Sequence, residues 1–139
     1  MKVYLAGAFS RQKELQKVAF KLSNLGVHVT SRWLYEIGPN DPNNPASVRL
    51  YRRETAFMDI QDVRESDMLV RFTDKTDGLL VPARLISGAR MFEFGMAWER
   101  GIPIVVVGGS QNIFDALPNI VHLPDTKALY DYLDAREPE

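Results

Sequence analysis

The chain has 139 residues, 45% of them hydrophobic and 25% charged, a composition that excludes a disordered or fibrous chain and fits a single domain over residues 1–139. A formal net charge of −1 argues against a broad nucleic-acid surface, so we expect a small-molecule partner rather than a nucleic acid. The absence of cysteine excludes disulfides, thiolate metal sites and cysteine nucleophiles.

The amino-terminal part of the chain is expected to alternate strand, helix and strand. A short apolar run from Lys2 to Ala6 ends at Gly7, which is typical of a buried strand that runs into a turn. From Ser10 onward apolar residues recur every three or four positions, which predicts a helix that stops at Gly26. A second strand is expected from Val27 to Trp33.

The middle of the chain begins with a loop and continues with a helix and a strand. Repeated prolines and turn-forming residues break regular structure between Gly38 and Pro45. Ser47 is the expected N-cap of a helix that runs to about Glu65. A third strand is then predicted at 68–72, followed by a second loop from Thr73 to about Pro82.

Strands and helices alternate again in the last third of the chain. The expected elements are a helix that carries Glu93 and ends at Gly101, a strand Ile104–Val107, a turn region from Asn112 to Pro118, a strand Ile120–Leu123 and a last helix capped by Asp125 or Thr126. This alternation favours a parallel sheet with helices on both faces, the doubly wound α/β arrangement. In such sheets ligands bind beyond the carboxyl ends of strands, here the turn after Ala6, the loop after Phe72 and the glycines after Val107.

Glu93 is the residue best placed for covalent chemistry. It lies in the early turns of its helix, where free N–H groups favour an ionised carboxylate, although the effect fades beyond the first turn. An ionised carboxylate is what attack on an anomeric carbon requires. The spacing alone favours a simpler interpretation, in which Glu93 only complements the helix dipole.

Asp59 is a second candidate carboxylate. Its neighbours at helical spacing, Ala56 and Val63, are small or apolar, so Asp59 is expected to lean toward the covered face, whereas Asp62 is expected to face solvent. Two carboxylates that converge on a sugar would match retaining glycosyl transfer. The alternative is an ordinary exposed acid on a charged helix.

Two strand-to-helix turns could hold an anion. Ser87 and Gly88 offer a hydroxyl and free amides before the helix of Glu93, although a plain serine N-cap is the alternative. Arg90 could add charge there or point to solvent. Gly7 and Ser10 form a similar turn, but it is neither a GxGxxG motif nor a P-loop.

Three aromatic residues, Phe9, Trp33 and Tyr35, lie at or just beyond expected strand ends. Their flat faces could stack on a base, and core packing is the alternative for each of them.

No metal, cofactor or membrane segment is expected. The two histidines, His28 and His122, are far apart and lack the HxxxH spacing of a zinc site. No run approaches the roughly 18 apolar residues of a membrane span, and the amino terminus does not have the pattern of a signal peptide. We therefore expect a cytoplasmic protein that works without a metal or cofactor.

Three features, taken in order, resemble the nucleoside 2-deoxyribosyltransferase family. They are Val3-Tyr4-Leu5-Ala6-Gly7, then Asp59 placed before Asp67-Met68-Leu69-Val70, and Glu93-x-Gly95-x-Ala97 before an apolar strand. The resemblance spans Val3 to about Leu133 and implies a flavodoxin-like fold. It also implies cleavage of the N-glycosidic bond of a 2′-deoxynucleoside, with transfer of the deoxyribosyl group to another base. By this resemblance Glu93 is the nucleophile that forms a glycosyl ester, Asp59 contacts the sugar and assists proton transfer, and Tyr4 orients the nucleophile.

The resemblance further implies a homodimer or larger homo-oligomer in which a neighbour completes the site, with Asn112 as the candidate contribution. Six residues before the nucleophile, the family's transferases tend to have a base-binding aspartate, whereas related 5′-monophosphate N-glycosidases have a phosphate-binding serine. This chain has Ser87 at that position. Transfer to a base and hydrolysis of a 5′-monophosphate therefore both stay open, and a nucleotide-binding module without catalysis is a third alternative.

Overall fold

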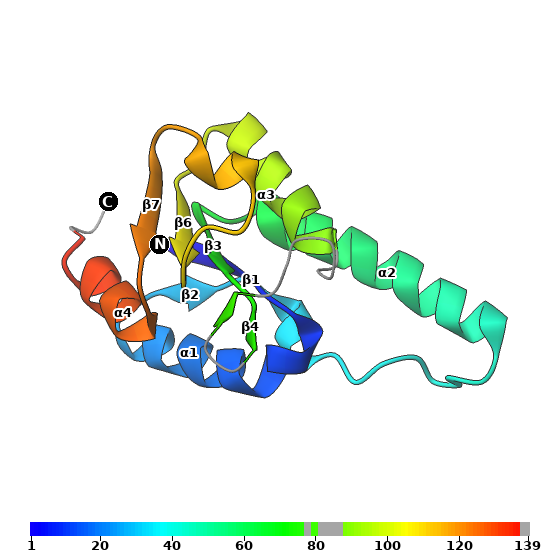
Figure 1. Cartoon of the computed structure of the whole chain (residues 1–139). Coiled ribbons are helices and arrows are strands. Elements are labelled where there is room, and N and C mark those ends of the chain that lie inside the picture. The colour runs from blue at the N-terminus through cyan, green and yellow to red at the C-terminus, as the bar shows by residue number, and fades with distance from the viewer. Residues whose placement is uncertain (77–78, 81–87, 137–139) are drawn as a thin grey trace.

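The computed structural model describes residues 1–76, 79–80 and 88–136, and within them five parallel strands form a central sheet (Figure 1). The strands are β1 (Lys2–Ala6), β2 (His28–Val29), β3 (Met68–Phe72), β6 (Ile104–Val107) and β7 (Ile120–Leu123). Their order across the sheet is β2-β1-β3-β6-β7. Numbered within this sheet alone, the order is 2-1-3-4-5, that of flavodoxin-like doubly wound folds. The predicted fold class is confirmed.

Helices cover both faces of the sheet, as the alternation predicts. Helices α1 (Gln12–Asn24) and α4 (Thr126–Asp134) lie on one face, and α2 (Pro45–Arg64) and α3 (Ala89–Arg100) lie on the other (Figure 1). The Lys21 ammonium of α1 lies 4.8 Å from the ring centre of Tyr130 on α4, which joins the first pair. The amino-terminal half of α2 extends beyond the sheet. No helix in the described part of the chain is long and apolar enough to cross a membrane.

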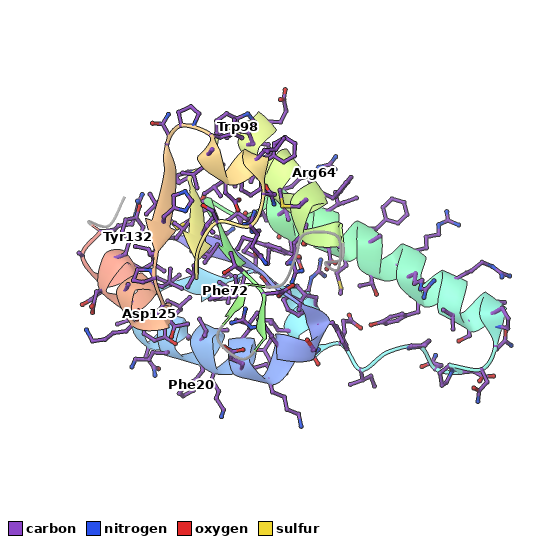
Figure 2. All side chains as sticks on the ribbon, in the orientation of Figure 1. Phe20, Arg64, Phe72, Trp98, Asp125 and Tyr132 are labelled. Atoms are coloured by element: carbon purple, nitrogen blue, oxygen red, sulfur yellow. The ribbon has the colours of Figure 1, made fainter. Side chains whose placement is uncertain are left out.

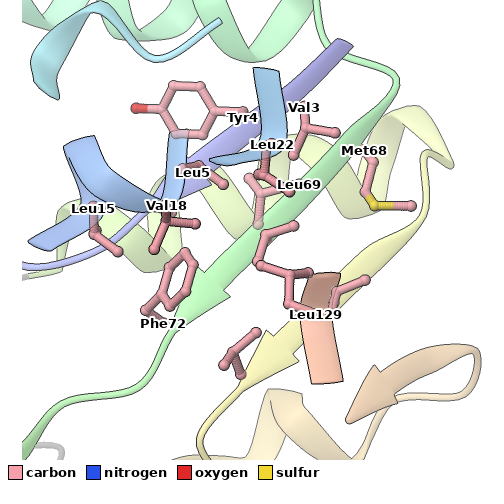
Figure 3. Packing of buried hydrophobic residues seen from close by; sticks show 14 of the residues in the cluster. Val3, Tyr4, Leu5, Leu15, Val18, Leu22, Met68, Leu69, Phe72 and Leu129 are labelled. Carbon is pink, nitrogen blue, oxygen red and sulfur yellow. The ribbon is translucent and has the colours of Figure 1, made fainter. Parts of the chain in front are cut away.

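The hydrophobic core is built around the middle strands. Every residue of β3 and β6 is buried, because helices cover both faces of a parallel sheet. On the α1 face, Leu15, Val18 and Leu22 of that helix pack toward Leu5 and Phe72 of the sheet (Figure 3). Complete burial of one such side chain contributes about 1.5–3 kcal/mol.

The predicted second strand is wrong beyond Val29. Its last residues form a 3-10 helix, η2 (Arg32–Tyr35), instead of continuing to pair with β1. Side chains take over that pairing: the Ser31 hydroxyl accepts from the Leu5 amide at 2.7 Å, and the Trp33 indole donates to the Leu5 carbonyl at 2.8 Å. The backbone is therefore released from the sheet without leaving Leu5 unpaired.

Two helix starts also differ from expectation. Asn44, not Ser47, caps α2, and its side chain accepts from the amides of Ala46 and Ser47. Pro45 fits the first helical position because its missing N–H would have no helical partner there. The first helix starts later than Ser10, which lies in a 3-10 helix, η1 (Phe9–Arg11).

Two predicted loops contain short regular elements. The loop after β3 holds an antiparallel pair, β4 (Lys75–Thr76) and β5 (Leu79–Leu80). The turn region before β7 holds a 3-10 helix, η4 (Ile113–Ala116). The predicted end of α3 is confirmed, since Gly101 adopts φ +72°, and so is the cap of α4, since the Asp125 side chain accepts from the Ala128 amide.

Candidate active site

Tyr4 and Glu93 meet between the sheet and α3. Strand alternation places Leu5 toward α1 and Tyr4 toward the opposite face, where α2 and α3 lie. Tyr4 is fully buried, and Glu93, in the second turn of α3, is 8% exposed. The Tyr4 hydroxyl donates a hydrogen bond to Oε2 of Glu93. The two residues are 89 positions apart, so the fold creates the pair.

The surroundings of Glu93 raise its pKa. Burial raises the pKa of Glu93 to about 8, the hydrogen bond from Tyr4 opposes that rise, and the charge of Asp59 adds to it. Burial also raises the pKa of Tyr4, so its hydroxyl stays protonated and remains a donor. Burial therefore outweighs the helix-dipole effect that was expected to favour the Glu93 carboxylate, an effect that fades past the first turn.

Asp59 lies beside this pair on α2. It is half-buried, and its charge raises the pKa of both Tyr4 and Glu93. Burial and the nearby charge of Asp62 raise the pKa of Asp59 itself to about 6. Its Oδ1 atom is buried and finds no hydrogen-bond partner in the described part of the protein. A buried oxygen without a partner costs about 1–3 kcal/mol, so Oδ1 is an acceptor ready for a ligand hydroxyl.

Asp62 does not face solvent as expected. Its side chain is buried, accepting from Nε of Arg32 at 2.8 Å and from the Arg32 amide at 3.0 Å. These bonds tie η2 to the end of α2 and offset the burial of the charge. The partner lies 30 residues away, which is why helical spacing could not reveal it.

The turn after β1 holds three residues that the sequence suggests for substrate binding: Gly7, which is closely packed, and Phe9 and Ser10, which are exposed. A Cβ atom on Gly7 would lie 2.6 Å from Cδ1 of the buried Leu15, so a side chain at this turn would require Leu15 to shift. Phe9 is 57% exposed, and Ser10 is exposed as well. Both lie in η1, just beyond the carboxyl end of β1, where a ligand could reach them.

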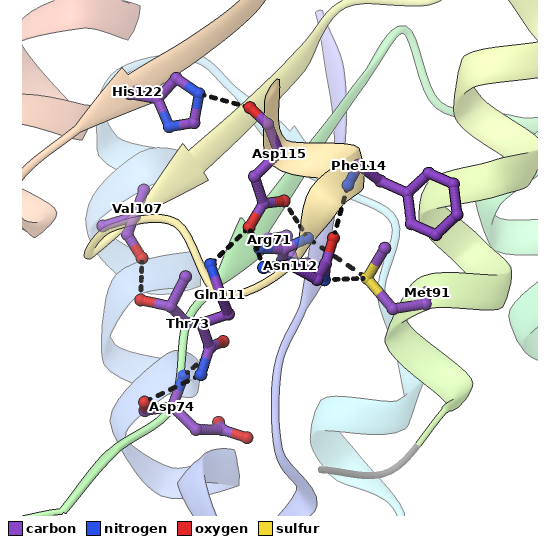
Figure 4. Close-up of polar contacts among 10 residues, drawn as sticks. All are labelled: Arg71, Thr73, Asp74, Met91, Val107, Gln111, Asn112, Phe114, Asp115 and His122. Atoms are coloured by element: carbon purple, nitrogen blue, oxygen red, sulfur yellow. Dashed lines mark hydrogen bonds and ion pairs between the residues drawn. The ribbon is translucent and has the colours of Figure 1, made fainter. Parts of the chain in front are cut away.

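The remaining sequence candidates separate into three cases. Trp33 is 7% exposed and packs in the core, the alternative to base stacking. Gly88 is exposed at the start of α3, and Ser87 lies outside the described residues. Asn112 caps η4 by accepting from the Phe114 amide at 2.9 Å, and its amide nitrogen contacts the Met91 sulfur at 3.3 Å (Figure 4). Its contribution to a neighbouring subunit stays a prediction.

Arg90 lies one helical turn before Glu93 and does not point to solvent. It is 5% exposed and forms two hydrogen bonds with the carboxylate of Asp74, at 2.8 Å and 2.5 Å. Its positive charge lowers the pKa of Glu93. The sequence singled out Arg90 but gave no indication of Asp74.

Arg71 is a further buried cation that sequence reasoning missed. It is 2% exposed, its guanidinium lies 5.3 Å from the ring centre of Phe94, and it forms a two-point ion pair with Asp115 at 2.6 Å and 2.7 Å (Figure 4). Burial opposes the charge of Asp115, but Arg71 and the amides of Gln111 and Asn112 hold its pKa below the usual value. An arginine inside an apolar strand requires a buried partner, and that was the signal available in the sequence.

A pocket of about 430 Å³ opens at the carboxyl ends of β3 and β6, between Arg11 and Asp125. Ligands of open parallel sheets bind beyond the carboxyl ends of the strands, which is where this pocket lies. Tyr4, Asp59 and Glu93 do not line it. The candidate active site is therefore defined by the three polar side chains and not by this pocket.

The sheet order places the protein in the class of flavodoxin-like α/β proteins. Among solved structures it is similar to a 2-deoxyribosyltransferase from the psychrotolerant bacterium Bacillus psychrosaccharolyticus, at 14% identity over 99% of this chain and 93% of that one, with a TM-score of 0.64. A CMP N-glycosidase of Clostridium botulinum matches at 17% identity over 98% and 100% of the two chains, with a TM-score of 0.59.

A conserved protein from Enterococcus faecalis V583 matches at 17% identity over 99% of both chains, with a TM-score of 0.59. No protein-family model and no curated protein sequence matches the chain. At these identities the similarity establishes a shared fold along nearly the whole chain. It supports the flavodoxin-like fold that the sequence predicts.

Proposed function

We propose that the protein cleaves the N-glycosidic bond of a 2′-deoxynucleoside and transfers the deoxyribosyl group to another base through an ester on Glu93. The observation that carries this proposal is the buried pair of Tyr4 and Glu93 with Asp59 beside it. Raised pKa values on two neighbouring acids are typical of catalytic sites, and a site that only binds ligands does not need them. The named activities of two structures with this fold, a 2-deoxyribosyltransferase and a CMP N-glycosidase, support the same chemistry.

The proposed reaction has two steps. The ionised Glu93 attacks the anomeric carbon, the bond to the base breaks, and its electron pair leaves with the base nitrogen, which takes a proton from Asp59. A second base then attacks the same carbon, displaces the Glu93 carboxylate and gives its own N–H proton to Asp59, which restores the starting state of the site. Because Tyr4 bonds Oε2, we assign the attack to Oε1, which has no hydrogen bond within the described residues.

The reacting state places the proton on Asp59 rather than on Glu93. The pKa of Asp59 is about 6 and that of Glu93 is about 8. Between these pH values most protein molecules without substrate therefore carry the proton on Glu93 and have an ionised Asp59. Only a small fraction of the protein is then reactive, and that fraction stays constant between the two pKa values. We expect kcat/KM to be level from about pH 6 to about pH 8 and to fall on either side.

Hydrolysis of a nucleoside 5′-monophosphate is the second candidate. Ser87 in the sequence and the CMP N-glycosidase among the similar structures favour it. Water would then take the place of the second base. The charges of the described site residues favour an uncharged nucleoside, since Arg90 is already paired with Asp74, Arg32 is already paired with Asp62, and the acid Asp59 lies beside Glu93.

The test is incubation with 2′-deoxynucleosides and their 5′-monophosphates, with and without a second free base, followed by chromatography of free and exchanged bases. We expect base exchange on nucleosides and a loss of about 10³-fold or more in Glu93→Gln. Glu99→Gln, a change of an exposed glutamate on the same helix, is the matched control and should keep full activity.

Three outcomes separate the alternatives. Unchanged activity in Glu93→Gln would overturn the mechanism. Base release from monophosphates alone, without exchange, would favour hydrolysis. Nucleotide binding with no released base would favour a module without catalysis.

A further inference from the structure

A buried ion pair lies one helical turn from the candidate nucleophile. The guanidinium of Arg90 on α3 meets the carboxylate of Asp74, which follows β3, and their side chains are only 7% and 15% exposed. Both oxygens of Asp74 accept a hydrogen bond, so the planar guanidinium is fixed in orientation as well as in position. We refer to these two residues as the Arg90–Asp74 clamp.

The carboxylate half of the clamp rests on a rigid support. The backbone N–H of Asp74 donates to Oε1 of the Gln111 side chain at 3.1 Å, and Nε2 of the same side chain donates to the Asp74 carbonyl at 3.2 Å (Figure 4). The preceding residue, Thr73, extends the sheet pairing, since its amide donates to the Val107 carbonyl at 3.0 Å. Asp74 is thus tied to the carboxyl edge of the central sheet and holds Arg90 there.

The clamp contributes the positive charge among the groups that act on Glu93. Tyr4 of β1 donates a hydrogen bond to Glu93, the negative charges of Asp59 and Asp62 on α2 act on it, and Arg90 acts from its own helix. Within the part of the chain that the structure describes, Arg90 is the one cation whose charge favours the Glu93 carboxylate. A neighbouring cation stabilises a carboxylate, and a cation already paired with an acid does so less strongly.

We propose that the clamp sets the protonation of Glu93, with Arg90 as a positioning residue whose charge favours the carboxylate and Asp74 as the group that fixes and partly neutralises that charge. The inference rests on the proposed function and deepens it, because it gives the charge of Arg90 a role in the ionisation of the nucleophile Glu93. Arg90 and Asp74 need not touch the substrate.

The two halves of the clamp have opposite effects when they are removed. Asp74→Asn leaves the charge of Arg90 less neutralised, so the pKa of Glu93 should fall. Arg90→Gln leaves an acid in place of a neutral pair, so the pKa of Glu93 should rise. A merely structural role would disturb Glu93 in the same direction in both variants.

The experiment is a ¹³C-carboxyl NMR titration of protein labelled at glutamate, with Glu93→Gln used to assign the Glu93 signal. We expect the Glu93 midpoint to move by about 0.5–1 pH unit, downward in Asp74→Asn and upward in Arg90→Gln. Arg90→Lys should restore part of the shift, and Arg53→Gln, which removes an exposed arginine of α2, should leave the midpoint unchanged. Midpoints that stay fixed, or that move in the same direction, would overturn the proposal.

The double variant Asp74→Asn/Arg90→Gln keeps the inference testable if a single variant fails to fold. It removes both charges together, and losing a buried pair is far less costly than leaving one partner alone. Its midpoint should lie between those of the single variants, and a midpoint outside that interval would also overturn the proposal. The titration does not require turnover: shifts without base release would reject the proposed function alone, and base release without shifts would reject the clamp alone.

Discussion

The proton on Glu93 is governed by groups on β1, on α2 and on α3 itself. Burial has the largest effect and favours the neutral acid, while the hydroxyl of Tyr4 favours the carboxylate. Asp59 acts against the carboxylate from α2, and Arg90 favours it from α3 itself. The pKa of about 8 is the balance of these effects, and removing any one neighbour should move it in a known direction.

Tyr4→Phe tests that balance at a single atom. The variant loses the hydrogen bond that stabilises the Glu93 carboxylate, so the pKa of Glu93 should rise above about 8. The upper limit of the level region in the kcat/KM profile should move to higher pH by the same amount, because that limit reports Glu93. In the level region, kcat/KM should fall about tenfold for each pH unit by which the pKa of Glu93 rises, because the fraction of molecules with an ionised Glu93 falls by that factor.

The measurement is the pH dependence of base release by the wild type and by Tyr4→Phe. The lower limit, near pH 6, belongs to Asp59 and should stay in place. An upper limit that stays fixed or moves to lower pH would contradict the role given to Tyr4.

At the scale of elements, a side chain at Gly7, in the turn between β1 and η1, would require the buried Leu15 to shift. Gly7→Ala would bring a Cβ atom to 2.6 Å from Cδ1 of Leu15, which is fully buried, so we expect a loss of about 1–2 kcal/mol in the free energy of unfolding. Gly95→Ala is the matched control on α3, where a Cβ atom meets nothing within 4 Å.

Gly95→Ala should stabilise the protein by about 0.5–1 kcal/mol, because alanine is the better helix former. Urea unfolding of both variants at one pH gives the comparison. A Gly7→Ala variant as stable as the wild type would show that Leu15 moves aside without cost.

Elements defined by local sequence were predictable. The β-branched run of β6, the glycine that ends α3 and the aspartate that caps α4 each carry their signal within a few residues. The start of η2 was not predictable, since it depends on bonds from Ser31 and Trp33 to a strand residue at least 26 positions away.

The same reason explains what was missed at the candidate site. Glu93, Asp59 and Tyr4 were chosen by resemblance to a family, and the fold brings them together. The burial of Asp62 depends on Arg32, and the clamp depends on Asp74, neither of which lies at helical spacing from its partner. Spacing within one helix cannot show a partner that another element supplies.

At the scale of the whole molecule, Tyr4 and Glu93 of the candidate site are buried between the sheet and its helices, and the amino-terminal half of α2 extends beyond the sheet (Figure 1). Side chains along the extended half of α2 stand away from the rest of the protein (Figure 2). Leu50 and Phe57 on this helix are 57% and 62% exposed. This surface is in keeping with the expected homo-oligomer, which stays a prediction, as does the cytoplasmic location.

The central claim is that Glu93 carries the sugar between the two steps. Its most direct test is mass spectrometry of protein quenched with acid during reaction with a 2′-deoxynucleoside in the absence of an acceptor base. We predict one added deoxyribosyl group on the peptide that contains Glu93, and none in Glu93→Gln. Base release without any sugar bound to the protein, or with the sugar on a different peptide, would contradict the account.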